Sequence, residues 1–291
     1  MQLHLYADDS QIFLVFNPKC NIQTQSARTT TETCVQDIRA WMHSNSLKLN
    51  DDKTELLVFH SRYTPRPCID SIKIGNDDIQ TSNSAKNVGV ILDNTLSYEK
   101  QVTAICKSAY YHLHNIRRIR KYLNQETTKM IIHAFVTSKM DYCNSLLYGL
   151  PNSMIQRLQS IQNTAARLVT GTSKYSHITP ILYHLHWLPV DMRIKFKILL
   201  FTFKALNNQA PLYITELLEE YAPTRSLRSG SKHLLKCERS RLKTYGDRSF
   251  AVAAPSLWNT LPLHIKVSES VDTFKHNLKT YLFKKSYSHI L

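Results

Sequence analysis

The sequence predicts an α+β fold in which a small, mostly antiparallel sheet with one helix comes first and a long, mostly helical region follows. In residues 1–93, short apolar runs rich in β-branched residues alternate with turn residues, as strands do. From Ser97 onward, apolar residues recur at the spacing of a helix face. With 291 residues and 43% hydrophobic content, the chain can form one large domain or two small ones.

The first sixteen residues, MQLHLYADDSQIFLVF, predict a β-hairpin. Leu3 and Leu5 alternate with polar neighbours before the turn, and residues 12–16 form a nearly continuous apolar run after it. We expect a helix next, from about residues 29–31 to about Asn45, because apolar residues recur there at helical spacing. These residues are Val35, Ile38, Trp41 and Met42.

More short strands are expected after this helix. The string LKLNDDKTELLVF predicts a loop that carries Asp51, Asp52 and Lys53 into a strand over residues 55–59. The string IKIGNDDIQ predicts a second hairpin, with its turn at residues 75–76. The string NVGVILD is rich in β-branched residues and predicts one further strand.

Helical periodicity dominates the rest of the chain. The expected helices cover residues 102–123, 126–147, 153–169, 191–207 and 271–283. On a helical wheel, the first of these helices gathers its apolar residues on one side. They are Val102, Ile105, Ala109, Ile116, Ile119 and Leu123. The opposite side carries Lys107, His114, Arg118 and Lys121.

The charge balance indicates a polyanionic partner. The 37 Lys and Arg residues exceed the 22 Asp and Glu residues, and the net charge of +15 favours nucleic acid, with an acidic membrane surface as the second candidate. The six cysteines lie far apart without a CxxC pair, which is typical of reduced thiols in an intracellular protein. Neither a signal sequence nor an apolar stretch long enough to span a bilayer is found, so we expect a soluble protein that is not secreted.

Asp8 and Asp9 allow two interpretations. Asp and Ser are ordinary turn residues, so both carboxylates can simply satisfy local backbone donors in a hairpin turn. The alternative is a metal site, because this pair lies at the tip of a hairpin whose strands are apolar, whereas the acidic pairs at residues 51–52 and 77–78 lie in polar turns. Rigid strands can position carboxylates for Mg²⁺, which prefers oxygen ligands and often takes substrate phosphates as well.

The order and spacing of several strings resemble one known family. YADD with its apolar strand, the helix with Trp41, NSLKLNDDKTELLVF and NVGVILDNTLS resemble the later palm motifs of non-LTR (LINE-type, jockey-like) retrotransposon reverse transcriptases. Four downstream strings resemble the thumb and carboxy-terminal region of the same elements: MDYCNSLLYGLP, LQSIQNTAARLVTGT, LHWLPVDMRIKFKILL and TYGDRSFAVAAPSLWNTLP. The resemblance covers essentially the whole chain. It implies the carboxy-terminal part of the palm in residues 1–98, thumb-like helices in 99–147 and a mostly helical, basic carboxy-terminal region in 148–291.

The resemblance also implies roles for individual residues. It makes Asp8 and its neighbour Asp9 the catalytic pair that holds the expected cofactor Mg²⁺, and the two residues before this pair shape the catalytic turn. Lys53 matches a family lysine near the incoming nucleotide, where an ammonium group could neutralise or protonate the leaving pyrophosphate. From the residues alone, Lys53 is a solvated loop lysine. Residues 89–93 match the primer-gripping hairpin, with a simple core strand as the alternative.

Two basic surfaces are assigned to nucleic acid. The thumb resemblance implies that the helix face described above meets the phosphates of an RNA template and of an RNA/DNA duplex. The residues assigned there are Lys107, His114, Arg117, Arg118 and Lys121. A second set, Arg239, Arg241 and Lys243, lies in the most basic stretch of the chain, where Tyr245 and Phe250 interleave with the charge. For both surfaces the alternative is a face that is only solvated.

The family pattern also includes parts that we expect to lie outside this chain: another metal-binding Asp on an upstream palm strand, the fingers and an amino-terminal endonuclease. We therefore expect a fragment of an RNA-directed DNA polymerase. The two-metal nucleotidyl transfer is the reaction of the polymerase from which the fragment descends, and we expect the fragment alone to be inactive. It would lie inside the cell, in the cytoplasm and nucleus as a ribonucleoprotein. Two alternatives stay open: a non-catalytic nucleic-acid-binding module and a helical protein-interaction remnant.

Overall fold

The computed structural model describes residues 1–7, 9–64, 67–75, 77–222, 233–240, 242 and 244–288. The chain divides into two compact units, Met1–Gln101 and Val102–Leu291. Helices and small sheets both occur, so the predicted α+β class is confirmed. The finer division into three parts, with boundaries after residues 98 and 147, stays a prediction.

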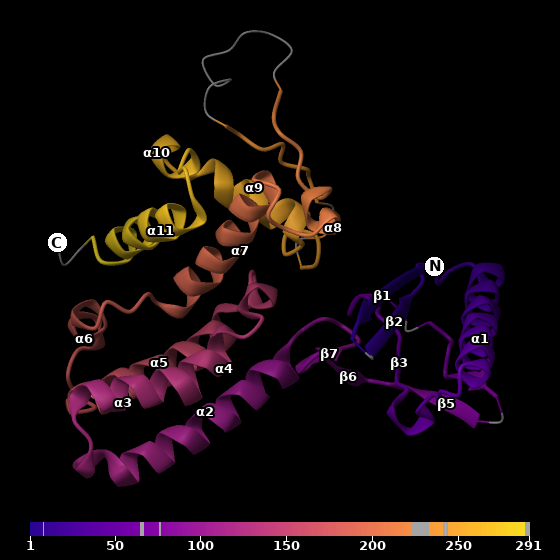
Figure 1. Cartoon of the computed structure of the whole chain (residues 1–291), viewed down its shortest axis with the longest axis horizontal. Helices are drawn as coiled ribbons and strands as arrows, with labels where there is room; N and C mark the ends of the chain where they lie inside the picture. The colour runs from indigo at the N-terminus through magenta and orange to yellow at the C-terminus, as the bar shows by residue number, and fades with distance from the viewer. Residues whose placement is uncertain are drawn as a thin grey trace. The chain divides into compact units, whose positions relative to one another are not determined.

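The first unit holds short strands and one long helix (Figure 1). Its described elements are β1 (Gln2–Tyr6), β2 (Asp9–Phe13), α1 (Asn21–Ser44), a 3-10 turn (Asp51–Lys53), β3 (Leu56–Leu57), β4 (Ser71–Ile74), β5 (Asp77–Ser82), β6 (Ser84–Asn87) and β7 (Val90–Asp93). Helix α2 (Glu99–Ile119) begins at its end and continues into the second unit. The strands form three small sheets in the described residues: β1 with β2, β5 between β3 and β4, and β6 with β7.

Hairpins form where local turn signals are strong. The predicted hairpins β1–β2 and β4–β5 are both present, and Gly75 turns the second with a φ of 64°. The strand expected over NVGVILD is present in the second part of the string as β7, but it does not cover the whole string, because Val88 and Gly89, with φ of 41° and 81°, reverse the chain between β6 and β7. Two adjacent residues with positive φ make the tight turn whose twist suits a hairpin. The strand expected at residues 55–59 is limited to β3, which runs parallel to β5.

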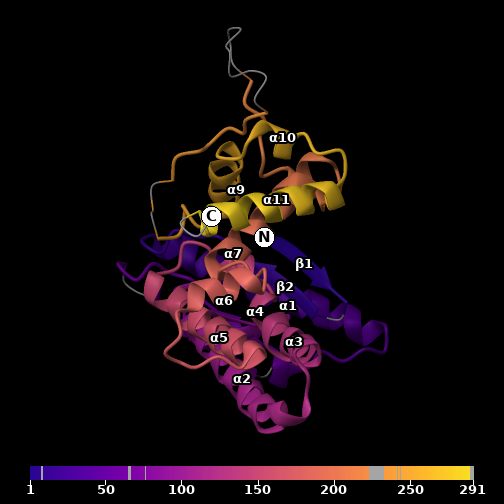
Figure 2. The ribbon, with the colours of Figure 1, turned by 90° about the vertical axis from the view of Figure 1, so that its left-hand side faces the viewer.

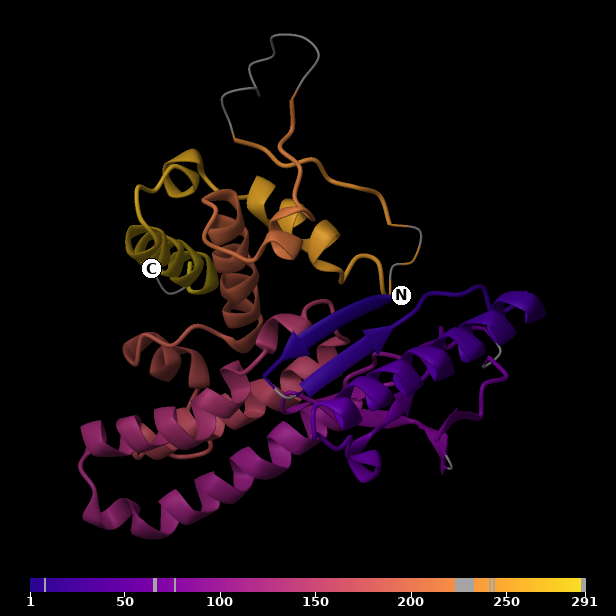
Figure 3. The ribbon, with the colours of Figure 1, turned by 45° about the vertical axis from the view of Figure 1, so that its right-hand side comes forward.

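Helix α1 starts earlier than the sequence indicated. Apolar periodicity placed its start near residues 29–31, but the helix begins at Asn21 and ends, as expected, next to Asn45. Its first turns are polar yet contain neither Gly nor Pro, so nothing interrupts the helix. Val35 packs against β4 in the core of this unit, whereas Trp41 is 62% exposed and takes no part in it. Figure 3 shows α1 and the β1–β2 hairpin of this unit.

The second unit is helical. Besides most of α2, its described helices are α3 (Gln125–Ile132), α4 (Ser138–Asp141), α5 (Asn152–Thr170), α6 (Ile178–His184), α7 (Val190–Leu206), α8 (Leu212–Thr215), α9 (Phe250–Asn259), α10 (Leu263–Lys266) and α11 (Val271–Ser286). A π-helical segment, His133–Thr137, joins α3 to α4. The helix expected to reach residue 147 therefore ends at Asp141, since Cys143 adopts a left-handed conformation with a φ of 50° and a 3-10 turn follows it. None of the described helices combines the length and apolar character that crossing a membrane would require.

Helix α7 is central to the core of the second unit. It packs against both α9 and α11, as Figure 2 shows. Phe203 of α7 and Phe274 of α11 stack with ring centroids 4.1 Å apart, and Trp258 of α9 lies beside Phe274. The apolar stripe predicted on the last helix is confirmed, because Phe274, Leu278 and Leu282 are buried.

Polar contacts connect distant segments of this unit. Arg193 of α7 forms a two-point ion pair with Asp141 of α4. The side-chain amide of Gln162 on α5 donates to the carbonyl of Leu188 at 2.8 Å. Arg248 donates to the carbonyl of Tyr148 at 3.2 Å, across the glycine at position 149. Each of the four downstream strings of the resemblance contributes at least one residue to these contacts.

Candidate functional site

The predicted catalytic turn lies in the β1–β2 hairpin. Asp9 is the first residue of β2 and pairs with Tyr6 across the ladder, and Ala7 follows β1 in the turn. Asp8, the other predicted metal ligand, lies outside the described residues. Ala7 has a φ of 52°, a left-handed conformation that costs a residue with a side chain about 1–2 kcal/mol. Asp9 and Tyr6 are both exposed, so this end of the hairpin is open to solvent.

One face of this hairpin is tied to the β6–β7 hairpin. Gln11 lies two residues after Asp9 and therefore projects from the same face of β2. Its side-chain amide donates a hydrogen bond of 2.7 Å to the side-chain oxygen of Asn87. Asn87 is the last residue of β6 and precedes the Val88–Gly89 turn of the predicted primer-gripping hairpin. The structure thus joins the two predicted hairpins through residues 76 positions apart, which the sequence analysis did not identify.

Lys53 lies in a different sheet environment. It ends the 3-10 turn before β3, and an ion pair between Asp51 and Arg39 of α1 anchors that turn. Strand β3 belongs to the sheet of β4 and β5, whereas Asp9 belongs to the β1–β2 sheet. In the described part of the chain, no hydrogen bond or ion pair joins Lys53 to Asp9, and Lys53 is exposed. The catalytic role of Lys53 therefore stays a prediction.

The residues that the structure describes do not by themselves fit Mg²⁺. Among them, no group of three or more His, Cys, Asp or Glu side chains lies close enough together to hold a metal ion. Asp9 provides a single carboxylate at the hairpin, and Mg²⁺ requires near-octahedral coordination by oxygen. A magnesium site at this hairpin would need Asp8 and further oxygen ligands.

Helix α2 presents the predicted nucleic-acid face to solvent. All five residues assigned to this face are exposed: Lys107, His114, Arg117, Arg118 and Lys121. None of them forms an ion pair with a carboxylate of the described chain. The sequence also lacks Asp and Glu between Lys100 and Gln125, and Glu99, at the start of α2, lies eight residues before Lys107.

The opposite side of α2 is buried for most of its length. Of the apolar residues expected there, Val102, Ile105, Ala109 and Ile116 are buried. Ile119 was wrongly assigned, because it is 46% exposed at the residue where the α-helix ends. A 3-10 turn over Arg120–Tyr122 follows and changes the angular spacing of the side chains.

Two arginines near the basic face serve the fold. Arg120 donates to the carbonyls of Leu168 and Val169 at 2.9 and 3.0 Å. These carbonyls lie in the last turn of α5, where backbone carbonyls lack partners within the helix. Arg157 of α5 donates to the hydroxyl of Thr103 on α2 at 3.0 Å. These hydrogen bonds link α5 to the first turns of α2 and to the 3-10 turn that follows α2.

Exposed tyrosines accompany the basic residues, and the sequence analysis missed them. Tyr110 and Tyr111 lie between Lys107 and His114 on α2, and Tyr122 follows Lys121 in the 3-10 turn. Their exposed fractions are 45%, 64% and 76%. A wheel of 100° per residue places Tyr110 and Tyr111 within about 60° of Lys107, so helical periodicity could have identified them.

The predicted nucleic-acid-binding residues in the basic stretch before α9 are only partly described by the structure. Arg239 is exposed, whereas Arg241 and Lys243 lie outside the described residues. Tyr245, expected to interleave with the charge, is half-buried. Arg248 packs against the turn after Leu147 through its bond to Tyr148, so it acts in the fold. The assignment of this stretch to nucleic acid stays a prediction.

Asp93 organises the junction between β7 and α2. Its carboxylate accepts hydrogen bonds from the backbone N–H groups of Thr95, Ser97 and Tyr98 and from the hydroxyls of Thr95 and Ser97. Burial alone would raise the pKa of Asp93, but these bonds outweigh it, and the pKa lies below its ordinary value. Asp93 therefore fixes the chain entering the helix that carries the basic face.

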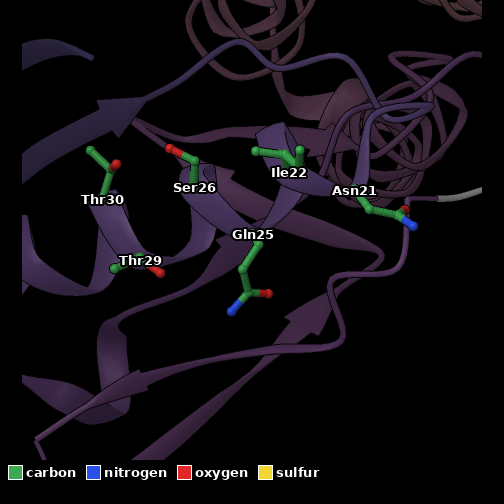
Figure 4. Close-up of a pocket in the computed structure, with 6 residues that line it drawn as sticks. All are labelled: Asn21, Ile22, Gln25, Ser26, Thr29 and Thr30. Carbon is green, nitrogen blue, oxygen red and sulfur yellow. The ribbon is translucent and has the colours of Figure 1, made fainter.

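A hollow of about 570 Å³ lies beside the first turns of α1 (Figure 4). It is lined by Asn21, Ile22, Gln25, Ser26, Thr29 and Thr30. These residues are all on one helix, and none carries an ionisable group. The hollow thus lacks both the charge of α2 and the carboxylate of the β1–β2 hairpin, and it offers no chemistry of its own.

Comparison with known proteins gives one informative similarity. The chain is similar to the protein described as "Probable RNA-directed DNA polymerase from transposon X-element" of Drosophila melanogaster, with 27% identity over 176 residues. The match covers 58% of this chain and 18% of the relative's length. No protein-family model and no solved structure matches the chain. The similarity supports a relationship with retrotransposon RNA-directed DNA polymerases, without distinguishing which region of such a protein or which class of element.

Proposed function

We propose that the chain is the carboxy-terminal part of a jockey-like retrotransposon reverse transcriptase and that its own task is to hold nucleic acid. The observation that carries the proposal is the face of α2, where five basic side chains are exposed and none is paired with a carboxylate of the described chain. A cationic stripe of this kind binds phosphates and releases their counterions. The ligands are an RNA template and an RNA/DNA duplex, held in a ribonucleoprotein of the cytoplasm and nucleus.

The proposal assigns the β1–β2 hairpin to a polymerase site that other parts of a longer protein complete. In such a site Asp8 and Asp9 would be ligands of Mg²⁺, and Lys53 would lie near the nucleotide. The described residues provide too few oxygen ligands for this metal, so the chain alone should not extend a primer.

Salt-dependent binding tests the proposal. The chain is titrated against a fluorescent RNA and against an RNA/DNA duplex at several salt concentrations. The triple variant Lys107→Gln, Arg118→Gln, Lys121→Gln should bind both more weakly, and the slope of log affinity against log salt should fall by about one for each lost cation. A control variant with the same charge change, Lys279→Gln, Lys284→Gln, Lys285→Gln on α11, should retain affinity and slope. Equal losses in both variants, or a flat salt dependence of the unmodified chain, would contradict the assignment to α2.

Primer extension tests the second half of the proposal. The purified chain is incubated with a template-primer, nucleotides and Mg²⁺, and no extension is expected. Extension that is abolished by Asp9→Asn would show that the chain already contains a complete catalytic site. The control is Asp37→Asn, which makes the same change at an exposed position of α1.

A further inference from the structure

We propose that the α2 face is a stacking platform for single-stranded nucleic acid, in which Tyr110, Tyr111 and Tyr122 receive bases while the cations hold phosphates. This inference rests on the proposed function and specifies the ligand of the same site. It differs from the duplex contact that the sequence analysis assigned to this face. Three exposed tyrosines among unpaired cations carry the inference.

Tyr110 and Tyr111 share one side of α2 with Lys107, His114 and Arg118, and Lys121 and Tyr122 follow in the 3-10 turn. Taking Lys107 as zero at 100° per residue, Tyr110 lies at about −60°, Tyr111 at about +40° and His114 at about −20°. Arg118 falls at about +20° on the same scale. With a rise of about 1.5 Å per residue, Lys107 and Arg118 are separated by about 16 Å along the axis, and both helical tyrosines lie between them. Two aromatic rings therefore lie between two positive charges on one side of the helix, a combination that binds single strands in other proteins.

The ring of Tyr111 contacts a second ring, which in turn contacts a third. It contacts His112 edge-on with centroids 5.4 Å apart, and His112 lies against Phe135 at the same centroid distance. Phe135 belongs to the π-helical segment between α3 and α4. This chain of rings restricts Tyr111 while 64% of its surface stays exposed, so less conformational entropy is lost when a base binds.

The ring of Tyr122 already has a cation beside it. The Lys121 ammonium lies 4.8 Å from the ring centroid, and 76% of Tyr122 is exposed. A base that stacks on this ring would place its backbone close to a positive charge. A positive charge and an exposed ring are thus available together in the 3-10 turn that follows α2.

Chemistry favours a single strand over a duplex at such a surface. In a duplex the faces of the bases are covered by their neighbours, so a protein meets mainly phosphates, sugars and groove edges. A cationic face without aromatic rings would satisfy those contacts. Exposed rings gain energy only from bases that are unstacked, and this stacking tolerates any sequence.

The test compares two probes on the full chain: an unstructured single-stranded RNA and an RNA/DNA duplex of equal length. The variant Tyr110→Ala, Tyr111→Ala, Tyr122→Ala should lose at least about five-fold in single-strand affinity for each stacked base. Its duplex affinity and its salt slope should stay within two-fold of those of the unmodified chain. Tyr175→Ala is the matched control, because Tyr175 is 84% exposed with the Lys174 ammonium 4.9 Å from its ring centroid, yet it lies outside α2.

The possible results separate the two proposals. If the tyrosine variant keeps its single-strand affinity while the Lys107, Arg118 and Lys121 variant loses it, the face binds by charge alone and the stacking inference is wrong. Equal losses on single strand and duplex would also overturn it, since they would indicate a supporting role of the tyrosines. If the unmodified chain binds neither probe, the proposed function itself fails.

Discussion

Asp93 offers a direct prediction about the helix that carries the basic face. The side chain is 6% exposed and accepts five hydrogen bonds, three at Oδ1 and two at Oδ2. In Asp93→Asn, the amide oxygen can keep the three bonds of Oδ1. The amide nitrogen then faces the Tyr98 N–H, whose hydrogen bond to Oδ2 is 2.7 Å long. Two donors cannot bond to each other, so one buried N–H loses its partner.

The expected loss follows from these contacts. An unsatisfied buried donor costs about 1–3 kcal/mol, and bonds to a neutral amide are weaker than bonds to a carboxylate. We expect the free energy of unfolding to fall by about 2–4 kcal/mol. The assay is urea unfolding of the full chain followed by circular dichroism. Asp37→Asn, the exposed control on α1, should change the value by less than about 0.5 kcal/mol.

The dependence on pH gives a second readout of the same carboxylate. The folded-state pKa of Asp93 lies below its ordinary value of 3.8. The contribution of the Asp93 carboxylate to the free energy of unfolding is therefore fully present above pH 3.8 and is lost as the pH falls through the folded-state pKa. The difference between the unmodified chain and Asp93→Asn should shrink over that acidic range. An Asp93→Asn variant as stable as the Asp37→Asn control at neutral pH would refute the assigned hydrogen bonds.

Three further substitutions test other features. Ala7→Gly should raise the free energy of unfolding by about 0.5–1 kcal/mol, because glycine adopts the left-handed conformation of Ala7 without strain. Ala40→Gly, on the exposed side of α1, should lower the free energy of unfolding by about 1 kcal/mol. Similar losses at both positions would contradict the left-handed conformation of Ala7. Arg193→Lys should lower the free energy of unfolding by about 1–2 kcal/mol, because lysine cannot reproduce the two-point contact with Asp141. Lys195→Gln removes a single contact with Asp191 and should lower it by less than about 0.5 kcal/mol. Equal effects would argue against the two-point contact. Burial, with a smaller effect of Asp191, raises the pKa of Tyr287 to about 12. The contribution of the neutral hydroxyl to the free energy of unfolding is therefore complete below pH 10 and is lost as the pH rises toward 12. Tyr287→Phe should cost about 1–2 kcal/mol at neutral pH and lack this alkaline loss, and identical alkaline profiles would show that the hydroxyl is not buried against the Trp187 carbonyl.

Local signals in the sequence predicted much of the fold. The β1–β2 and β4–β5 hairpins follow from turn residues between apolar runs, and the buried side of α2 follows from helical spacing. The start of α1 was missed because its first turns are polar, so periodicity gave no signal there. The end of α4 was missed because the break depends on the backbone conformation of Cys143, a residue without a turn preference.

The candidate site was less predictable because its contacts are distant in sequence. Gln11 and Asn87 are 76 positions apart, and neither residue type marks such a pairing. Arg120 looks like another surface cation in the sequence, and only its bonds to the end of α5 show that it is structural. Tyr111 resembles an ordinary helix residue until its exposure and its support by His112 are known. Tertiary packing decides which cations and rings are available to a ligand.

Photochemical cross-linking would test the central claim most directly. The full chain is bound to a single-stranded RNA, irradiated and digested, and the cross-linked peptides are identified by mass spectrometry. We predict cross-links on the peptides of residues 107–122, with loss of the signal in the Tyr110, Tyr111 and Tyr122 variant. Cross-links confined to other helices, such as α7 or α11, would contradict the assignment of nucleic-acid binding to α2.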